Sequence, residues 1–197
     1  MPAHLFRNNS FLKIVVGIIP GILVLDQLTK WLARLFLKPV YSVSIIGDFF
    51  RLTYVENPGI AFGLRISNKI IFTILSIVAV IIIFYYLFSL HNHKFLRVAF
   101  ACILGGAVGN LTDRFIFGRV VDFLDFEFFD IHISPFNFLF LNFSGYQMDR
   151  WPVFNVADIA VTIGMIMIIV NAFLDRRSKK TVSSNGDQKA DISGIRR

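Results

Sequence analysis

The feature that most constrains this chain is a pair of long apolar segments without a charged side chain. Residues 70–90 contain no charged residue, glycine or proline, and residues 159–174 are likewise uncharged. A membrane-crossing helix needs about 20 predominantly apolar residues, which both segments approach. A soluble domain of about 200 residues would have to bury both helices on every side, which domains of this size rarely do. We therefore predict a membrane protein.

Two further segments are apolar but reach the length of a span only with polar residues at one end. The first, residues 14–25, must continue through Asp26 and Lys30, and the second, residues 98–112, must extend to Asp113. We predict four transmembrane helices, at about residues 13–33, 69–90, 96–115 and 154–174.

The net charge of +7 is distributed as expected for a protein with several membrane spans. Lysine and arginine concentrate before residue 14, in the connection 91–97 and after residue 174, whereas residues 115–153 are mainly acidic. Because basic loops stay in the cytoplasm, we predict that both termini are cytoplasmic and that residues 115–153 lie outside. The topology accounts for the positive charge, so no nucleic-acid partner is expected.

The resulting fold class is an all-α polytopic membrane protein with two extracytoplasmic elements. Residues 41–56 alternate and are rich in β-branched and aromatic side chains, which predicts a small β-rich element between helices 1 and 2. A long loop should join helices 3 and 4, and its phenylalanine-rich part, residues 123–151, suits the headgroup region. We predict a membrane-embedded domain over residues 1–175 and a disordered basic cytoplasmic tail over 176–197.

Three carboxylates fall at the outer boundary of the predicted spans, namely Asp26, Asp113 and Asp158. A carboxylate at membrane depth costs about 2.5 to 3.5 kcal/mol, so three on one side indicate one site. Asp26 and Lys30 have the i,i+4 spacing of a structural ion pair, and Asp113 beside Arg114 suits a tether of the third helix. No cation of its own helix reaches Asp158, which favours a functional role.

Asp122, which follows the third span, competes with Asp113 to partner Asp158, and the spacing alone leaves this choice open. Two carboxylates held close together share one proton. The ionised member can activate a water while the protonated member donates to a carbonyl oxygen, which hydrolyses an amide. The chain has no HExxH, CxxC or P-loop motif, so neither a metal nor a cofactor is expected.

Glycines at a spacing of four indicate close packing of helices, at Gly105 and Gly109 and again at Gly17 and Gly21. A small transporter or channel is the main alternative function, because it would also place carboxylates in a membrane. It predicts acidic residues spread through the membrane depth, whereas here they cluster at one face.

Five segments resemble, in order, the motifs of the lipoprotein signal peptidase (signal peptidase II) family. They are DQLTK from Asp26, NPGIAFG from Asn57, GGAVGNLTDR from Gly105, VVDF from Val120 and FNVAD from Phe154. The resemblance covers residues 11–175. The segment between the last two motifs is longer than is usual in the family. We expect residues 128–150 to be the insert.

The resemblance implies an aspartic endopeptidase that removes signal peptides from prolipoproteins, cutting before a cysteine that carries a diacylglyceryl group. It implies that Asp122 and Asp158 are the catalytic pair, and that the partners are lipid-modified prolipoproteins and membrane lipids. We expect the protein to be a monomer. The positions that match supporting or substrate-binding residues of the family are Asp26, Lys30, Asn57, Gly59, Asn110, Asp113, Arg114, Asn155 and Ala157.

Overall fold

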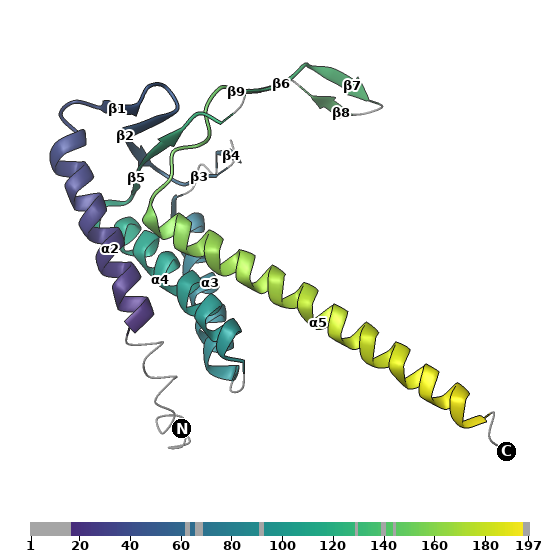
Figure 1. Ribbon diagram of the computed structural model, residues 1–197. Coiled ribbons are helices and arrows are strands. Elements are labelled where there is room, and N and C mark those ends of the chain that lie inside the picture. The colour runs from purple at the N-terminus through teal and green to yellow at the C-terminus, as the bar shows by residue number, and fades with distance from the viewer. Residues whose placement is uncertain are drawn as a thin grey trace.

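The structure is a computed structural model of the 197-residue chain, and helices form most of it (Figure 1). It describes residues 17–61, 64–65, 69–90, 93–128, 130–138, 141–143 and 145–194. The predicted start of the first span at residues 13–16, Phe62 and Gly63 of the second motif, and the last three residues of the predicted tail lie outside these ranges.

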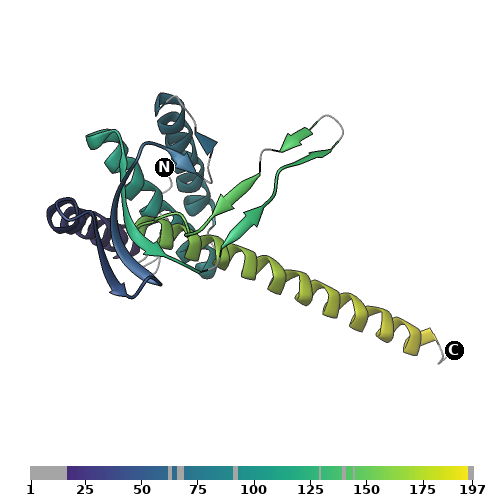
Figure 2. The ribbon, with the colours of Figure 1, turned by 90° about the horizontal axis from the view of Figure 1, so that it is seen from above.

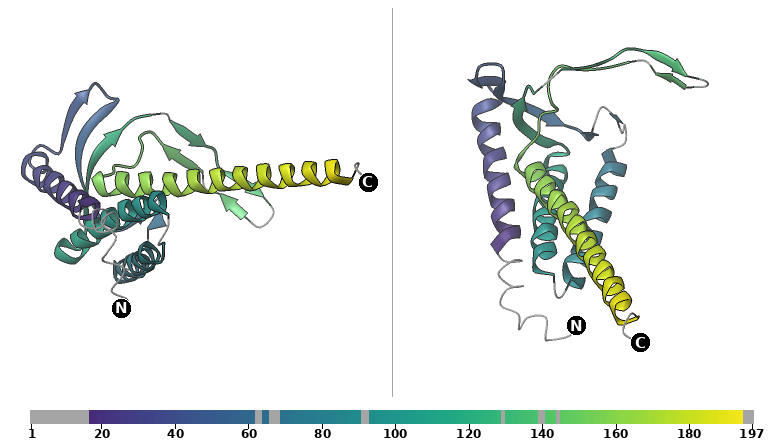
Figure 3. Two further views of the ribbon diagram at one scale, coloured as in Figure 1. Left: turned by 60° about the horizontal axis from the view of Figure 1, so that its bottom comes forward. Right: turned by 45° about the vertical axis from the view of Figure 1, so that its right-hand side comes forward.

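The helices pack around α4, which contacts each of the other three (Figure 3). Their bounds are close to the predicted spans at α3 and α4, and α5 begins two residues later than predicted. The helices are α2 (Ile19–Leu32), its π-helical continuation η3 (Ala33–Leu37), α3 (Lys69–Ser89), α4 (Lys94–Phe117) and α5 (Val156–Gly194).

Glycines on α4 allow this close packing, as predicted for Gly105 and Gly109. A Cβ atom at Gly109 would lie 2.6 Å from Oδ2 of Asp26 on α2, and one at Gly106 would lie 2.3 Å from the carbonyl oxygen of Ala157 on α5. Both distances are shorter than any van der Waals contact. Any larger residue would therefore separate the helices that carry the acidic side chains.

Helix α2 departs from the prediction in two respects. Gly17 and Gly21 have nothing within 4 Å of an added Cβ atom, so the predicted close packing at these glycines is wrong. The helix also continues through η3 to Leu37, about four residues beyond the predicted end of the span at residue 33. Asp26 and Lys30 form an ion pair within this helix.

A three-stranded antiparallel sheet lies at one end of the helices (Figure 1). Strands β1 (Ser42–Ile46) and β2 (Phe50–Asn57) confirm the strands predicted between helices 1 and 2. Strand β5 (Val120–Phe126) comes from the connection between α4 and α5 and pairs with β2. The sheet is fixed to the bundle by a cluster of buried apolar residues, namely Ala33, Leu37, Tyr54, Val121 and Phe123.

The connection between α4 and α5 is not the plain loop that the sequence predicts. After β5 it forms two short antiparallel ladders that project away from the helices (Figure 2). Two minimal strands also follow β2. The short strands are β3 (Ile60–Ala61), β4 (Leu64–Arg65), β6 (Ile131–Ile133), β7 (Phe136–Phe138), β8 (Leu141–Phe143) and β9 (Tyr146–Met148).

Two helices of the described chain are long and apolar enough to cross a membrane, α4 and residues 156–175 of α5. Residues 73–89 of α3 form a shorter apolar helix. Apolar side chains are widely exposed on these helices, for example Ile81 at 61% and Ile169 at 54% exposed. The fold is therefore mostly helical with a small sheet, and the number of spans stays a prediction.

Helix α5 continues beyond the predicted boundary at residue 175, as far as Gly194. The segment 176–194 contains no proline, and its backbone can form hydrogen bonds within the helix without a hydrophobic core. The division into a domain over 1–175 and a separate tail remains a prediction, since α5 runs across the predicted boundary.

Candidate active site

Asp122 lies on β5, where its side chain is almost fully buried at 3% exposed. Its two carboxylate oxygens accept hydrogen bonds from two asparagine amides. Nδ2 of Asn155 lies 2.6 Å from Oδ1, and Nδ2 of Asn57 lies 3.1 Å from Oδ2. The carboxylate is thus held by neutral donors, with no lysine or arginine in direct contact among the described hydrogen bonds and ion pairs.

Asp158 lies in the first turn of α5, where it forms a reciprocal cap with Asn155. The backbone N–H of Asn155 donates to Oδ2 of Asp158 at 3.1 Å, and the backbone N–H of Asp158 donates to Oδ1 of Asn155 at 3.0 Å. This is the capping-box arrangement, which satisfies backbone N–H groups that a helix start leaves without partners. Nδ2 of Asn110, on α4, donates to the other oxygen of Asp158 at 2.8 Å.

Asn155 joins the two carboxylates and is fully buried. Its amide nitrogen donates to Asp122, its amide oxygen accepts from the N–H of Asp158, and its own N–H donates to that carboxylate. The fold therefore brings the predicted candidates together: Asp122 on β5 and Asp158 on α5 both form hydrogen bonds with Asn155.

The environment of Asp122 favours its protonated form. Burial in the protein is the main cause, and the nearby charge of Asp158 adds to it, while the amides of Asn57 and Asn155 act in the opposite direction. Together they raise the pKa of Asp122 to about 7. The electrostatic coupling with Asp158 is the behaviour expected of two carboxylates that compete to ionise.

A fully buried ion network lies beneath this pair, formed by Asp26, Lys30 and Asp113. Nζ of Lys30 lies 2.9 Å from Asp26 Oδ2 and 3.2 Å from Asp113 Oδ2. The predicted i,i+4 ion pair between Asp26 and Lys30 is thus present, and a carboxylate from α4 shares its cation. Lys30 also donates to Oδ1 of Asn110 at 2.8 Å, which connects the network to the partner of Asp158.

Asp113 has its oxygens engaged away from Asp158. Besides Lys30 it pairs with Arg34 at 2.8 Å, and it accepts from the backbone N–H of Val121 at 3.1 Å. The last contact ties the end of α4 to β5, as the predicted tether would. Of the two candidates that the sequence left open, Asp122 shares Asn155 with Asp158, and Asp113 belongs to the ion network.

The other predicted residues lie around the same centre. The N–H of Gly59 donates to Oδ1 of Asn57 at 2.9 Å in a turn where Gly59 has a φ of 112°, a conformation that favours glycine. The N–H of Ala157 donates to Asp26 Oδ1 at 2.9 Å. Arg114 interacts electrostatically with three carboxylates, those of Asp158, Asp122 and Asp113.

The sequence interpretation missed two polar residues of the ion network, Gln27 and Arg34. Nε2 of Gln27 donates to the carbonyl of Gly109 at 3.1 Å and links α2 to α4. Arg34 follows Asp26 and Lys30 at successive spacings of four, a polar stripe on one face of the helix that was available in the sequence. Within the described ranges, no group of three or more His, Cys, Asp or Glu side chains is arranged to hold a metal ion.

Comparisons with known proteins identify the family of this chain. The model of the family described as "Signal peptidase (SPase) II" matches residues 18–174. A lipoprotein signal peptidase of Pelodictyon phaeoclathratiforme is 37% identical over 161 residues, which cover 81% of this chain and 89% of the relative. Another, of Moorella thermoacetica, is 40% identical over 148 residues, covering 75% of this chain and 84% of the relative.

The fold is also similar to that of solved structures. One, described as a bacterial membrane enzyme, has a TM-score of 0.66 and 29% identity, and the match covers 84% of this chain and 90% of the other. A second with the same description has a TM-score of 0.61 and 30% identity over 80% of this chain and 91% of the other. Since the family model matches most of its length, the chain belongs to the signal peptidase II family of membrane peptidases.

Proposed function

We propose that this chain removes signal peptides from diacylglyceryl-modified prolipoproteins, cutting before the lipidated cysteine, with Asp122 and Asp158 as its catalytic pair. Membership of the family and the many similar proteins named lipoprotein signal peptidase support the reaction. The observation that carries the choice of residues is the position of Asn155, which binds both carboxylates at once.

In the proposed mechanism the two carboxylates share one proton. Asp158 accepts a proton from a water, which attacks the scissile carbonyl carbon, while Asp122 donates its proton to the carbonyl oxygen. The tetrahedral intermediate then collapses and the C–N bond breaks. Asp158 gives the proton that it took from the water to the departing amine, and a hydroxyl of the intermediate returns a proton to Asp122 as the new carboxyl group forms. No covalent intermediate is needed.

The surroundings of the pair support this division of labour. The raised pKa of Asp122 keeps a proton on that residue up to about pH 7. Asp158 lies in the first turn of α5, where the helix dipole favours a negative charge, and it accepts two hydrogen bonds. Asp122 is therefore assigned as the acid and Asp158 as the base.

The remaining polar residues are assigned supporting roles. Asn57 and Asn110 orient one carboxylate each, and the ion network of Asp26, Lys30 and Asp113 fixes the helices that carry them. Arg114 supplies positive potential near the pair. Each of these residues would act through the geometry or the electrostatic field of the two carboxylates.

The position of the pair also suits a lipidated substrate. Asp122 is on β5 and Asp158 is in the first turn of α5, which begins at the end of the bundle that carries the sheet (Figure 1). A diacylated cysteine would keep its acyl chains in the bilayer and present the adjoining peptide bond at headgroup level. We propose four spans, cytoplasmic termini and a site at the outer face of the inner membrane, with the enzyme acting as a monomer.

The test is cleavage of a diacylglyceryl-modified prolipoprotein by the purified protein in detergent, followed by gel shift. Asp122→Asn and Asp158→Asn should each lower the rate by at least about 10²-fold, because each removes a proton-transfer group. Asp113→Asn should keep some activity. Asp125→Asn is the matched control, since Asp125 lies on the same strand as Asp122 and is also buried.

Each outcome is decisive for one part of the proposal. Full activity of Asp122→Asn would transfer the acid role to Asp113. No cleavage by a folded wild-type protein would overturn the reaction itself. Equal cleavage of a precursor without the diacylglyceryl group would retain the peptidase and exclude the proposed specificity.

A further inference from the structure

Strand β2 changes its pairing with β5 close to the proposed catalytic pair. Residues 50–52 pair with β5 in one register, and residues 55–57 pair in a register shifted by one residue. Thr53 and Tyr54 lie between these segments, opposite the single residue Phe123. An extra residue in one strand of an antiparallel pair is a β-bulge, and a bulge beside an active site can re-aim a side chain.

This bulge decides which side chain of β2 faces Asp122. Directly opposite residues of an antiparallel pair lie on the same face of the sheet, and every second residue of a strand shares that face. Val55 is opposite Asp122, so Asn57 lies on the face of Asp122, where its Nδ2 donates to Oδ2 at 3.1 Å. Without the shift Tyr54 would be opposite Asp122, and Glu56 would take the place of Asn57.

Tyr54 and Glu56 are instead held on the opposite face of the sheet. The hydroxyl of Tyr54 donates to Oε1 of Glu56 at 2.9 Å, and Nζ of Lys38 lies 3.3 Å from the same oxygen. Nη1 of Arg119 donates to Oε2 of Glu56 at 3.1 Å. The ring of Tyr54 belongs to the buried cluster that fixes the sheet to the bundle. These contacts keep the carboxylate of Glu56 away from Asp122.

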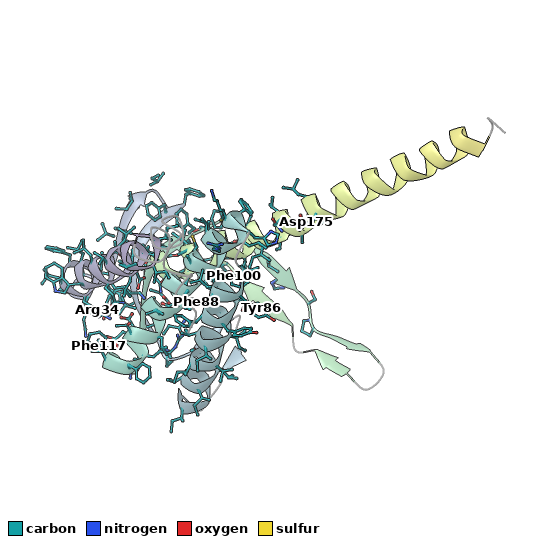
Figure 4. All side chains as sticks on the ribbon, turned by 90° about the horizontal axis from the view of Figure 1, so that it is seen from below. Arg34, Tyr86, Phe88, Phe100, Phe117 and Asp175 are labelled. Atoms are coloured by element: carbon teal, nitrogen blue, oxygen red, sulfur yellow. The ribbon has the colours of Figure 1, made fainter. Side chains whose placement is uncertain are left out.

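Arg34 holds η3 in the position that covers this opposite face. Its guanidinium binds Asp113 at 2.8 Å and lies over the ring of Phe117 at the end of α4, with 4.0 Å from Cζ to the ring centroid (Figure 4). The next turn of the same segment places Leu37 in the buried cluster with Tyr54. The bulge therefore separates two environments, with an amide toward Asp122 and a phenol toward η3.

Thr53 ties the bulge to both neighbouring strands. The residue is buried, and its Oγ1 donates to Oδ2 of Asp125 on β5 at 2.6 Å. Its oxygen also lies 2.8 Å from Oγ of Ser42 on β1, and Ser42 donates there because the hydroxyl of Thr53 has only one hydrogen. The backbone N–H of Tyr54 donates to the carbonyl of Tyr41 at 2.8 Å. The bulge is thus held from β1 on one side and from β5 on the other.

We propose that Thr53 is a positioning residue, whose hydroxyl fixes the bulge of β2 and thereby directs Asn57 toward Asp122. Thr53 binds Asp125, which lies three residues along β5 from Asp122 and therefore on the other face of the sheet. It acts on the carboxylate through Asn57. The inference rests on the proposed function for the role of Asp122 as the acid, but the proton on Asp122 can be measured without a substrate.

The experiment titrates Asp122 in the full-length protein in detergent. The infrared band of the protonated carboxyl group reports the fraction of Asp122 that holds a proton, and Asp122→Asn identifies this band by its loss. Thr53→Val removes the hydroxyl and keeps the shape of the side chain, whereas Thr53→Ser keeps the hydroxyl. Ser44→Ala is the matched control, because its exposed hydroxyl on β1 donates to the carbonyl of Gly47 in the adjoining turn.

Thr53→Val should raise the pKa of Asp122 from about 7 by about one pH unit, because the carboxylate loses the amide of Asn57 that stabilises its ionised form. Thr53→Ser and Ser44→Ala should titrate as the wild type. Asp125→Asn should do the same, since it keeps an acceptor oxygen for the hydroxyl. The charged groups that act on the carboxylate from the helices are unchanged in these variants, namely Asp158 on α5, Lys30 on α2 and Arg114 on α4.

Asn57→Ala tests the route through the amide. Alone it should raise the pKa of Asp122 by the same amount, and Thr53→Val added to it should have no further effect, because both changes remove one hydrogen bond. An unchanged titration in folded Thr53→Val would overturn the proposal, and so would additive shifts in the double variant. Thr53→Ala replaces Thr53→Val in both arms if the latter does not fold. Because the titration needs no cleavage, failure of the proposed reaction would leave its result intact.

Discussion

Asp122 should make the stability of the protein fall as the pH rises toward 8. Burial and the charge of Asp158 raise its pKa from 3.8 to about 7. Between these two values the folded state holds a proton that the unfolded chain has lost. The contribution of this proton is therefore fully present below the unfolded pKa and is lost as the pH rises through the folded pKa.

The size of this effect follows from the separation of the two pKa values. One pKa unit corresponds to about 1.4 kcal/mol, so the whole effect is about 4 kcal/mol of unfolding free energy. About 3 kcal/mol of it is lost between pH 5 and pH 8. For a chain of about 200 residues this corresponds to a fall in Tm of about 6 to 12 °C.

Thermal unfolding in one detergent at pH 5 and pH 8 measures this effect. Asn cannot ionise, so Asp122→Asn should remove this share of the fall in Tm. Asp149→Asn is the control, because Asp149 is exposed and bound only by Gln147 among the described contacts, and it should behave as the wild type. An equal fall in Asp122→Asn and in the wild type would refute the assignment of the raised pKa to Asp122.

Three other changes test the ion network, the helix contact and the acid. Lys30→Met leaves the buried Asp26 without a cation and Asp113 with Arg34 alone, so it should lower the unfolding free energy in denaturant by about 3 to 5 kcal/mol. Lys38→Met, at an exposed pair, should cost about 0 to 1 kcal/mol. Gly106→Ala places a Cβ atom 2.3 Å from a carbonyl oxygen of α5 and should cost about 1 to 3 kcal/mol and slow cleavage, unlike Gly21→Ala. The cleavage rate should fall above pH 7 by about tenfold per pH unit as Asp122 loses its proton, and a flat profile of kcat against pH would exclude this acid.

The helices were predictable because their signals are local. The uncharged run at 70–90 becomes α3 (Lys69–Ser89), and the shorter run at 98–112 becomes α4 once its polar flanks are included. The i,i+4 spacing likewise predicted the contact of Asp26 with Lys30. Each of these features depends on residues within a few turns of one another.

The parts that escaped prediction depend on contacts between distant segments. The continuation of α2 through η3 to Leu37 was not predicted, because there Ala33 and Leu37 pack against distant residues of the sheet such as Tyr54. The pairing of β5 with β2 joins segments about 70 residues apart. For the same reason the residues alone left Asp113 and Asp122 as equal partners of Asp158, and the family resemblance was needed to choose.

The hydrogen bonds of the three asparagines show how the site is prepared for negative charge. Each amide oxygen is occupied by a donor: Lys30 at Asn110, the N–H of Gly59 at Asn57 and the N–H of Asp158 at Asn155. An amide whose oxygen is engaged in this way must direct its NH₂ group to the opposite side.

Those NH₂ groups face the two carboxylates, since Asn57 and Asn155 donate to Asp122 and Asn110 donates to Asp158. The orientation is fixed before any substrate arrives, and neutral donors stabilise the shared charge without forming a tight ion pair that would hold both carboxylates ionised. Lys30 reaches the pair through Asn110, and Arg114 adds positive potential near it. The pair can thus retain its proton, which is the property that hydrolysis by two carboxylates requires.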